Sequence, residues 1–114
     1  MNNPYHAQEQ VANQDAAIQR LLELYSIAIE ANASGEQETL AHSLALLKKT
    51  LNPNANPALA GELAALYTAA EKAAQNKQPA LAAEILETLR GFWVARTRIE
   101  KKFNKSLKLF LALP

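Results

Sequence analysis

The sequence predicts an all-α protein, folded as an antiparallel up-and-down four-helix bundle with a long C-terminal helix. Alanine and leucine are abundant, only three of the 114 residues are glycine, and β-branched and aromatic residues are sparse, a composition that favours helix over sheet. Apolar residues recur at helical spacing in four segments, and the connections between these segments are short. Short connections between helices favour antiparallel neighbours. With 49% hydrophobic and 20% charged residues, the chain has the size and composition of one globular domain.

The first helix is expected over about residues 14–32, after a flexible N-terminal arm formed by residues 1–13. Asn13 is suited to the N-cap position, and Asp15 would interact favourably with the positive end of the helix dipole. We expect residues 14–114 to form a single helical bundle domain. The apolar stripe of the first helix comprises Ile18, Leu21, Leu22, Tyr25 and Ile29.

The second helix is expected over about residues 36–51. The segment "SGEQ" at 34–37 matches a Ser-x-x-Gln capping box, which satisfies two backbone N–H groups at a helix start. Leucines then step by four, three and four residues and form one buried seam: Leu40, Leu44, Leu47 and Leu51.

The third helix is expected over residues 57–75. The segment "NPNANP" before it contains two prolines and is typical of a turn. Asn56 can cap the helix, and Pro57 can occupy its first position, where the missing N–H costs nothing.

The fourth helix is expected over about residues 79–111, which corresponds to roughly 50 Å against roughly 25–30 Å for the first and third helices. Its far end therefore extends beyond the surface that the other helices cover. The exposed apolar side chains there could be covered by the N-terminal arm, by a second copy or by a client chain, or the end could fray. We assign a dimer or partner contact to Ile99, Phe103, Leu107 and Phe110.

Positive charge is concentrated in the same helix. Residues 1–89 carry five basic and ten acidic groups, whereas residues 90–110 carry seven basic groups and one acidic group. Cations near a helix C-terminus are favourable on a solvated face, and this is the favoured interpretation. Contact with an acidic partner or an anionic membrane comes second. Nucleic-acid binding is third, because no recognised motif is present and the pI is about 8.0.

Several classes of function are not expected. The chain has no cysteine, and His6 and His42 lack partners at metal-ligand spacing, so we expect no metal and no cofactor. No nucleophile with a recognisable base and no phosphate-binding loop is present, so we do not expect an enzyme. The N-terminus lacks the features of a secretory signal, and no apolar run has the length of a membrane span. We therefore expect a cytoplasmic protein.

Four stretches of the sequence resemble the flagellin export chaperones (FliS). "NPYHAQEQ" at 3–10 is similar to the Asn-Pro-Tyr opening of that family. "IQRLLELYSIAIEA" at 18–31 is similar to its first helix, although Ser26 and Ile27 replace Asp-Gly. "GELAALYTAA" at 61–70 and "EILETLRGFW" at 84–93 are similar to its third helix and to its Leu-Arg-x-x-Trp ending. The present sequence is shorter than the family pattern at the first and third helix connections.

The resemblance implies a cytoplasmic four-helix bundle that binds the C-terminal segment of flagellin, prevents premature polymerisation and delivers the subunit for flagellar export. Such recognition places a helix in an apolar groove and couples binding to folding. The residues that the resemblance points to as client-binding are Tyr5, Leu24, Tyr25, Ile29, Leu66, Tyr67 and Trp93.

Each of these residues also has a purely structural interpretation. Tyr5 could cap a client groove or tack a loose arm to the bundle. Tyr25 and Tyr67 suit a groove wall, but core tyrosines with satisfied hydroxyls are the favoured interpretation. Trp93 could line a groove or fill the bundle end. The alternative function is a self-associating helical bundle, or a chaperone for another secreted client, with the basic C-terminal helix as the dimer or membrane contact.

Overall fold

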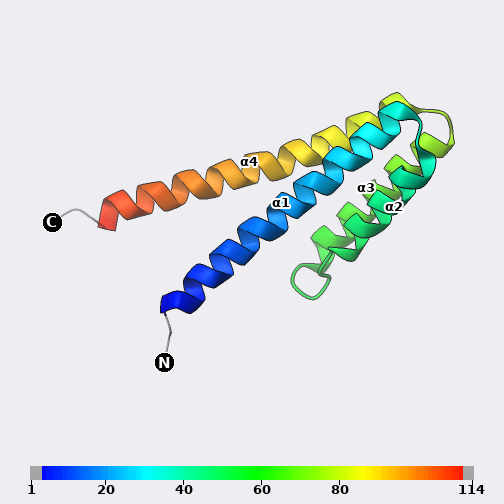
Figure 1. Ribbon diagram of the computed structural model, residues 1–114. Helices are drawn as coiled ribbons and strands as arrows, with labels where there is room; N and C mark the ends of the chain where they lie inside the picture. Colours follow the sequence, from blue (N-terminus) through cyan, green and yellow to red (C-terminus); the bar gives the residue numbers. More distant parts are fainter. Residues whose placement is uncertain (1–3, 112–114) are drawn as a thin grey trace.

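The computed structural model of the chain contains four helices, α1 (Pro4–Ser34), α2 (Gln37–Lys49), α3 (Pro57–Gln75) and α4 (Pro79–Leu111) (Figure 1). The backbone is described for residues 4–111 and the side chains for residues 16–98 and Lys102. No strand occurs in that part of the chain. Each helix packs against the next, and α4 packs against α1, so the four surround a common core. The prediction of an all-α protein with four helices is confirmed.

The start of α1 differs from the prediction. We expected the first helix to begin at about residue 14, with Asn13 as its N-cap, but α1 begins at Pro4 and includes Asn13. Proline fits the first position of a helix, and no glycine or further proline interrupts the segment before Gly35. Helix propagation through the intervening alanine, glutamine and glutamate residues therefore continues past the local capping signal.

Two tight turns close one end of the molecule. Gly35, which follows α1, has φ 72°, and the N–H of Glu36 donates to the carbonyl of Ala31 at 2.9 Å. Lys77, near the end of α3, has φ 60°, and the N–H of Gln78 donates to the carbonyl of Ala73 at 2.8 Å. Both are Schellman motifs with a left-handed residue after the helix. They explain why the α1–α2 and α3–α4 connections are so short.

The predicted capping box at residues 34–37 does not form. Ser34 belongs to the last turn of α1, and the N-cap residue of α2 is Glu36, whose side chain makes no capping hydrogen bond. The chain reverses within two residues around Gly35. The serine is therefore used by the helix before the turn and not by the helix after it.

The predicted start of α3 is confirmed. The side-chain oxygen of Asn56 accepts a hydrogen bond from the N–H of Leu59 at 3.1 Å, and Pro57 occupies the first helical turn. The helix ends at Gln75, as predicted. This cap fixes the point at which the chain leaves the α2–α3 connection, which forms one wall of the groove described below.

The core changes in side-chain size along its length. Near the two tight turns, α1, α3 and α4 meet mainly through small side chains, and farther along the helices the core contains leucine and tyrosine. The helices spread apart with distance from the turns (Figure 1), which agrees with small residues permitting the closest approach of helix backbones. The buried alanines near the turns are Ala28, Ala31, Ala73, Ala74 and Ala82.

One hydrogen bond ties α1 to α4 at this closed end. The side-chain nitrogen of Asn32 donates to the carbonyl of Pro79 at 2.8 Å, and Asn32 is only 7% exposed. Pro79 is the first residue of α4, so its carbonyl lies next to the α3–α4 turn. The bond therefore fixes where α4 departs relative to the end of α1.

Candidate partner-binding groove

A groove opens beside the α2–α3 connection, away from the two tight turns. It has a volume of about 570 Å³ and lies between α1, the α2–α3 connection, α3 and α4. We call it the open-end groove. Most of its lining is apolar, and these residues are Ala17, Ile18, Leu21, Leu24, Leu51, Ala55, Leu59, Ala60, Leu63, Tyr67 and Trp93.

The groove exists because the helices differ in length and direction. The helix α2 ends at Lys49, and the connection to α3 turns back there, whereas α1 and α4 pass this level (Figure 1). The apolar faces of α1 and α4 at this level are therefore only partly covered by the α2–α3 hairpin. Leu21, Leu24 and Trp93 are accordingly partly buried, although each packs against the core.

Two tyrosines and the tryptophan join α1, α3 and α4 beneath the groove. The hydroxyl oxygens of Tyr25 and Tyr67 lie 2.5 Å apart, and the Nε1–H of Trp93 donates to the Tyr25 hydroxyl at 3.1 Å. Both tyrosines are 0% exposed, and their ring centroids are 6.1 Å apart. Buried polar groups that satisfy one another in this way fix the relative register of three helices. We call this set the Tyr25–Tyr67–Trp93 network.

The protonation state of the network follows from its burial. Desolvation raises the pKa of Tyr25, and hydrogen bonds from Tyr67 and Trp93 partly oppose that effect. Desolvation also raises the pKa of Tyr67, and its interaction with Tyr25 raises it further. Both groups therefore remain neutral phenols near pH 7. They stabilise the core as hydroxyl groups and supply no negative charge to the groove.

The charged side chains that line the groove are Arg20 of α1 and Arg96 of α4. The guanidinium carbon of Arg96 lies 5.5 Å from the centroid of the Trp93 ring, within the range of a cation–π interaction. Phe92 packs edge-on against the same tryptophan, with 5.4 Å between ring centroids. Among the described residues, the lining includes no aspartate or glutamate.

The structure separates the seven residues that the sequence indicated as client-binding. Leu24, Tyr67 and Trp93 line the open-end groove, and Tyr25 lies beneath it through its bond to Trp93. Ile29 lies toward the closed end, in a separate hollow with Asn32 and Pro79. Of the two that remain, Leu66 is 40% exposed outside the groove, and the side chain of Tyr5 lies outside the described ones.

The four residues assigned to a dimer or partner contact cannot be placed in the same way. Their backbone belongs to α4, which is described to Leu111. Their side chains lie outside the described ones: Ile99, Phe103, Leu107 and Phe110. On the described part of α4, Phe92 is 48% exposed and Leu81 is 44% exposed.

Sequence reasoning missed several residues that form the groove. Leu51 was expected only as a member of a helix seam, yet it lines the groove together with Leu59 and Leu63 of α3. Arg20 was not singled out, and Arg96 appeared only as part of the basic run. The sequence did contain a signal for the leucines. Where an apolar stripe continues beyond the end of the neighbouring helix, its last residues must contact something other than that helix. Nothing in the sequence indicated that the two arginines share one site.

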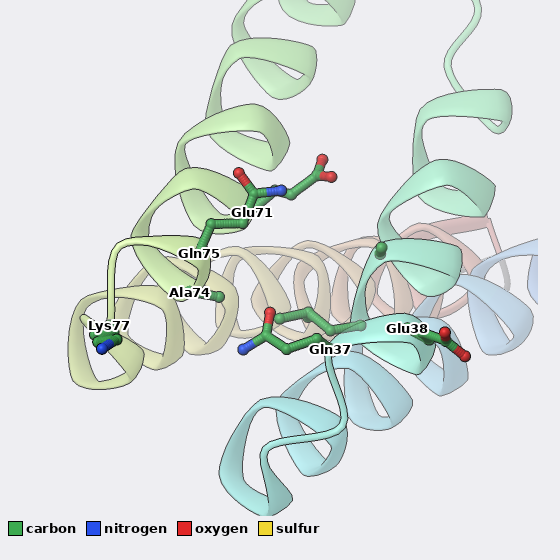
Figure 2. Close-up of a pocket in the computed structure, with 8 residues that line it drawn as sticks. Gln37, Glu38, Glu71, Ala74, Gln75 and Lys77 are labelled. Atoms are coloured by element: carbon green, nitrogen blue, oxygen red, sulfur yellow. The ribbon is translucent and has the colours of Figure 1, made fainter.

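Two further hollows lie at the closed end, and neither brings functional groups together. One, of about 550 Å³, lies between the start of α2 and the end of α3. Its charged side chains, Glu38, Glu71 and Lys77, point in different directions and do not converge on a common point (Figure 2). The other, of about 650 Å³, is lined mainly by small residues around Gly35 and Pro79. The open-end groove is therefore the stronger candidate site.

Within the described part of the chain, no group of three or more histidine, aspartate and glutamate side chains is arranged to hold a metal ion. Over the same residues, no helix has the length and apolar character needed to cross a membrane. Comparison of the chain with protein-family models, with curated proteins and with solved structures finds no match.

Proposed function

We propose that this protein is a cytoplasmic export chaperone that holds an amphipathic helical segment of a client polypeptide in the open-end groove. The observation that carries the proposal is the groove itself, which exposes leucines from α1, α3 and the α2–α3 connection beside Trp93. Its mainly apolar wall matches helix-in-groove recognition, in which residues at i, i+3, i+4 and i+7 of the guest insert into the groove. The resemblance to flagellin export chaperones makes the C-terminal segment of flagellin the proposed client, which the protein would keep from polymerising before export.

The proposed architecture is an antiparallel up-and-down bundle with a long C-terminal helix, α4, of 33 residues; α1, with 31 residues, is nearly as long. The ring of neighbouring helices and the two tight turns at one end support this arrangement. In it, α1 and α4 flank the groove and continue past it, so a guest helix could lie along them. The rigid closed end would then orient the groove walls before the client arrives.

Calorimetric titration with the C-terminal segment of a flagellin from the same source tests the proposal. We expect saturable one-to-one binding with a negative heat-capacity change, because the guest buries apolar surface as it folds. Leu59→Gln, inside the groove, should weaken binding about tenfold or more, since a buried leucine contributes about 1.5–3 kcal/mol. Leu81→Gln is the matched control, because Leu81 is exposed on α4 outside the groove. Equal affinities of the two variants would contradict the assignment of the groove.

The second candidate function is self-association through the end of α4. A self-associating bundle of this kind could also serve as a chaperone for another secreted client. The observations that favour it are the continuation of α4 to Leu111 and the exposure of Phe92 on its described part. Serine in place of Phe103, Leu107 and Phe110 should then convert a dimer into a monomer in sedimentation experiments. A monomeric wild-type protein at high concentration would rule this function out. Vesicle binding that weakens with added salt would instead indicate a membrane contact.

A further inference from the structure

Helix α4 carries an apolar face that the bundle leaves exposed. Leu81 is 44% exposed and Phe92 is 48% exposed, and Ile85 between them is only partly buried. Successive spacings of four and seven residues place the three on one side of the helix. Leu86 and Leu89, by contrast, are buried in the core. We call Leu81, Ile85 and Phe92 the outer face of α4, and none of the three lines the open-end groove.

Side chains of opposite charge accompany the two halves of the outer face. Glu84 lies eight residues before Phe92, and Arg98 and Lys102 lie six and ten residues after it. The separations of Glu84 from the two cations are about four and five helical turns, so the three charges share one flank of α4. All three side chains are exposed, and among the described residues none of them forms an ion pair.

We propose that the outer face of α4 is a homodimer interface, in which α4 of one copy packs antiparallel against α4 of a second copy with Phe92 near the centre. Glu84 of each copy then lies between Arg98 and Lys102 of the other, and the two-fold symmetry forms this contact twice. A parallel arrangement would instead place Arg98 beside Arg98 and Lys102 beside Lys102. The charge pattern of α4 therefore favours a second copy as the occupant and fixes its direction.

This interface goes beyond the proposed function, because it lies outside the open-end groove. A dimer formed in this way leaves that groove open to a client. The interface also differs from pairing through the end of α4, since its centre is Phe92 and its apolar contacts begin at Leu81.

Gly91, next to Phe92, permits close approach of the two helices at the centre of the interface. Apart from the adjoining backbone of α4, a Cβ at this position would meet no atom within 4 Å in the described structure. Packing inside one copy therefore does not require glycine here, although glycine in a helix interior weakens the helix. A second helix that crosses at Gly91 would use the space that a side chain would otherwise fill.

Sedimentation equilibrium of the full chain, from micromolar to submillimolar concentration, tests the interface. We expect a reversible monomer–dimer equilibrium. Gly91→Gln should abolish the dimer, because its side chain enters the contact, and should raise the melting temperature of the dilute monomer by about 2 °C through better helix propensity. Gly61→Gln is the matched control, because Gly61 is also an exposed helical glycine with open space around it but belongs to α3. This control should gain similar stability and keep the dimer.

Charge-reversal variants test the direction of pairing. Glu84→Arg and Arg98→Glu should each weaken self-association about tenfold, because each replaces two attractive contacts of the dimer by repulsive ones. An equimolar mixture of the two variants should associate more tightly than either variant alone, since position 84 of one chain then faces an opposite charge at position 98 of the other. Glu38→Arg is the control, because it reverses a charge on α2, diagonally across the bundle from α4.

The outcomes distinguish this interface from the client groove and from the end of α4. A chain that stays monomeric at the highest concentration, or a dimer that Gly91→Gln leaves intact, would overturn the inference. A dimer that is lost only when serine replaces Phe103, Leu107 and Phe110 would place the contact at the end of α4 and would overturn it as well.

Titration of Gly91→Gln with the flagellin segment separates the inference from the proposed function. We expect the variant to bind the segment as tightly as the wild-type protein does. Failure of both proteins to bind would contradict the proposed function, and a dimer that is sensitive to Gly91→Gln would still support the interface. Binding that is lost in the variant alone would assign the outer face to the client and would overturn the inference.

Discussion

Replacing Tyr25 by phenylalanine tests the Tyr25–Tyr67–Trp93 network most directly, because both of its hydrogen bonds involve the Tyr25 hydroxyl. The substitution retains the ring and its packing in the core. It removes the acceptor of the Trp93 N–H and the partner of the Tyr67 hydroxyl. The tryptophan is partly buried and can recover a bond to water, whereas Tyr67 is 0% exposed and cannot do so in the folded state.

The expected loss follows from these two consequences. A hydrogen bond contributes about 1 kcal/mol net, and a buried hydroxyl left without a partner costs about 1–3 kcal/mol. Tyr25→Phe should therefore lower the free energy of unfolding by about 3 kcal/mol, or the melting temperature by about 12 °C at about 4 °C per kcal/mol. Tyr67→Phe leaves the Trp93–Tyr25 bond in place and should cost only about 1 kcal/mol.

The double variant is the decisive comparison. Adding Tyr67→Phe to Tyr25→Phe removes the hydroxyl that the first change stranded, so the second change should be neutral or stabilising in that background. Urea unfolding followed by circular dichroism gives the four free energies of the cycle. If Tyr67→Phe lowers the free energy of unfolding by about 1 kcal/mol both in the wild-type protein and in Tyr25→Phe, the two hydroxyls do not depend on each other and the reasoning is refuted.

Three further predictions concern other features of the fold. Burial raises the pKa of both Tyr25 and Tyr67 above the ordinary value of 10.0, so the tyrosines of the unfolded chain lose their protons first as the pH rises. The free energy of unfolding should therefore be level below about pH 10 and fall above it. Urea midpoints at successive pH values would show this fall, which should be less steep in Tyr67→Phe. A loss of stability that begins well below pH 9 would contradict this assignment. Lys77→Gly should stabilise the protein by about 0.5 kcal/mol. The left-handed conformation costs lysine about 1 kcal/mol and glycine nothing, but glycine also increases the entropy of the unfolded chain, which cancels part of the gain. A lower melting temperature of the variant would exclude this account. Asn56→Ala should cost about 1 kcal/mol through loss of the α3 cap, with Asn54→Ala in the same connection as the control, and equal melting temperatures for the two would show that the cap contributes nothing.

The sequence predicted those parts of the fold that depend on local signals. The cap at Asn56 and the bounds of α3 rest on side chains within a few residues of each other. In the predicted leucine seam, Leu40, Leu44 and Leu47 are buried as their spacing indicated, but α2 ends at Lys49, and Leu51 lies beyond it and is only partly buried. The start of α1 could not be decided locally, because Asn13 and Pro4 both carry start signals. The choice depends on whether helix propagation continues between them.

The groove was beyond the reach of sequence spacing for a different reason. The sequence singled out Tyr25, Tyr67 and Trp93 individually. However, Tyr25 is 42 residues from Tyr67 and 68 residues from Trp93 along the chain, and these are the two residues with which it forms hydrogen bonds. Their meeting depends on the register of three helices, which the turns at Gly35 and Lys77 set. That Arg20 and Arg96 line the same groove also depends on this register, so neither residue could be assigned to a site from the sequence.

Because the core changes from alanine to leucine along its length, a change of helix packing at the closed end tilts the helices and displaces their more distant parts. A tilt of about 5° at the alanine contacts, carried along the roughly 15 Å of helix that separates them from the groove, displaces the groove wall by about 1.3 Å. A small change of separation at Ala31 or Ala74 is thus enlarged at the groove lined by Leu24 and Trp93. The residues that determine how wide the groove opens are accordingly small, buried and far from anything the groove could touch.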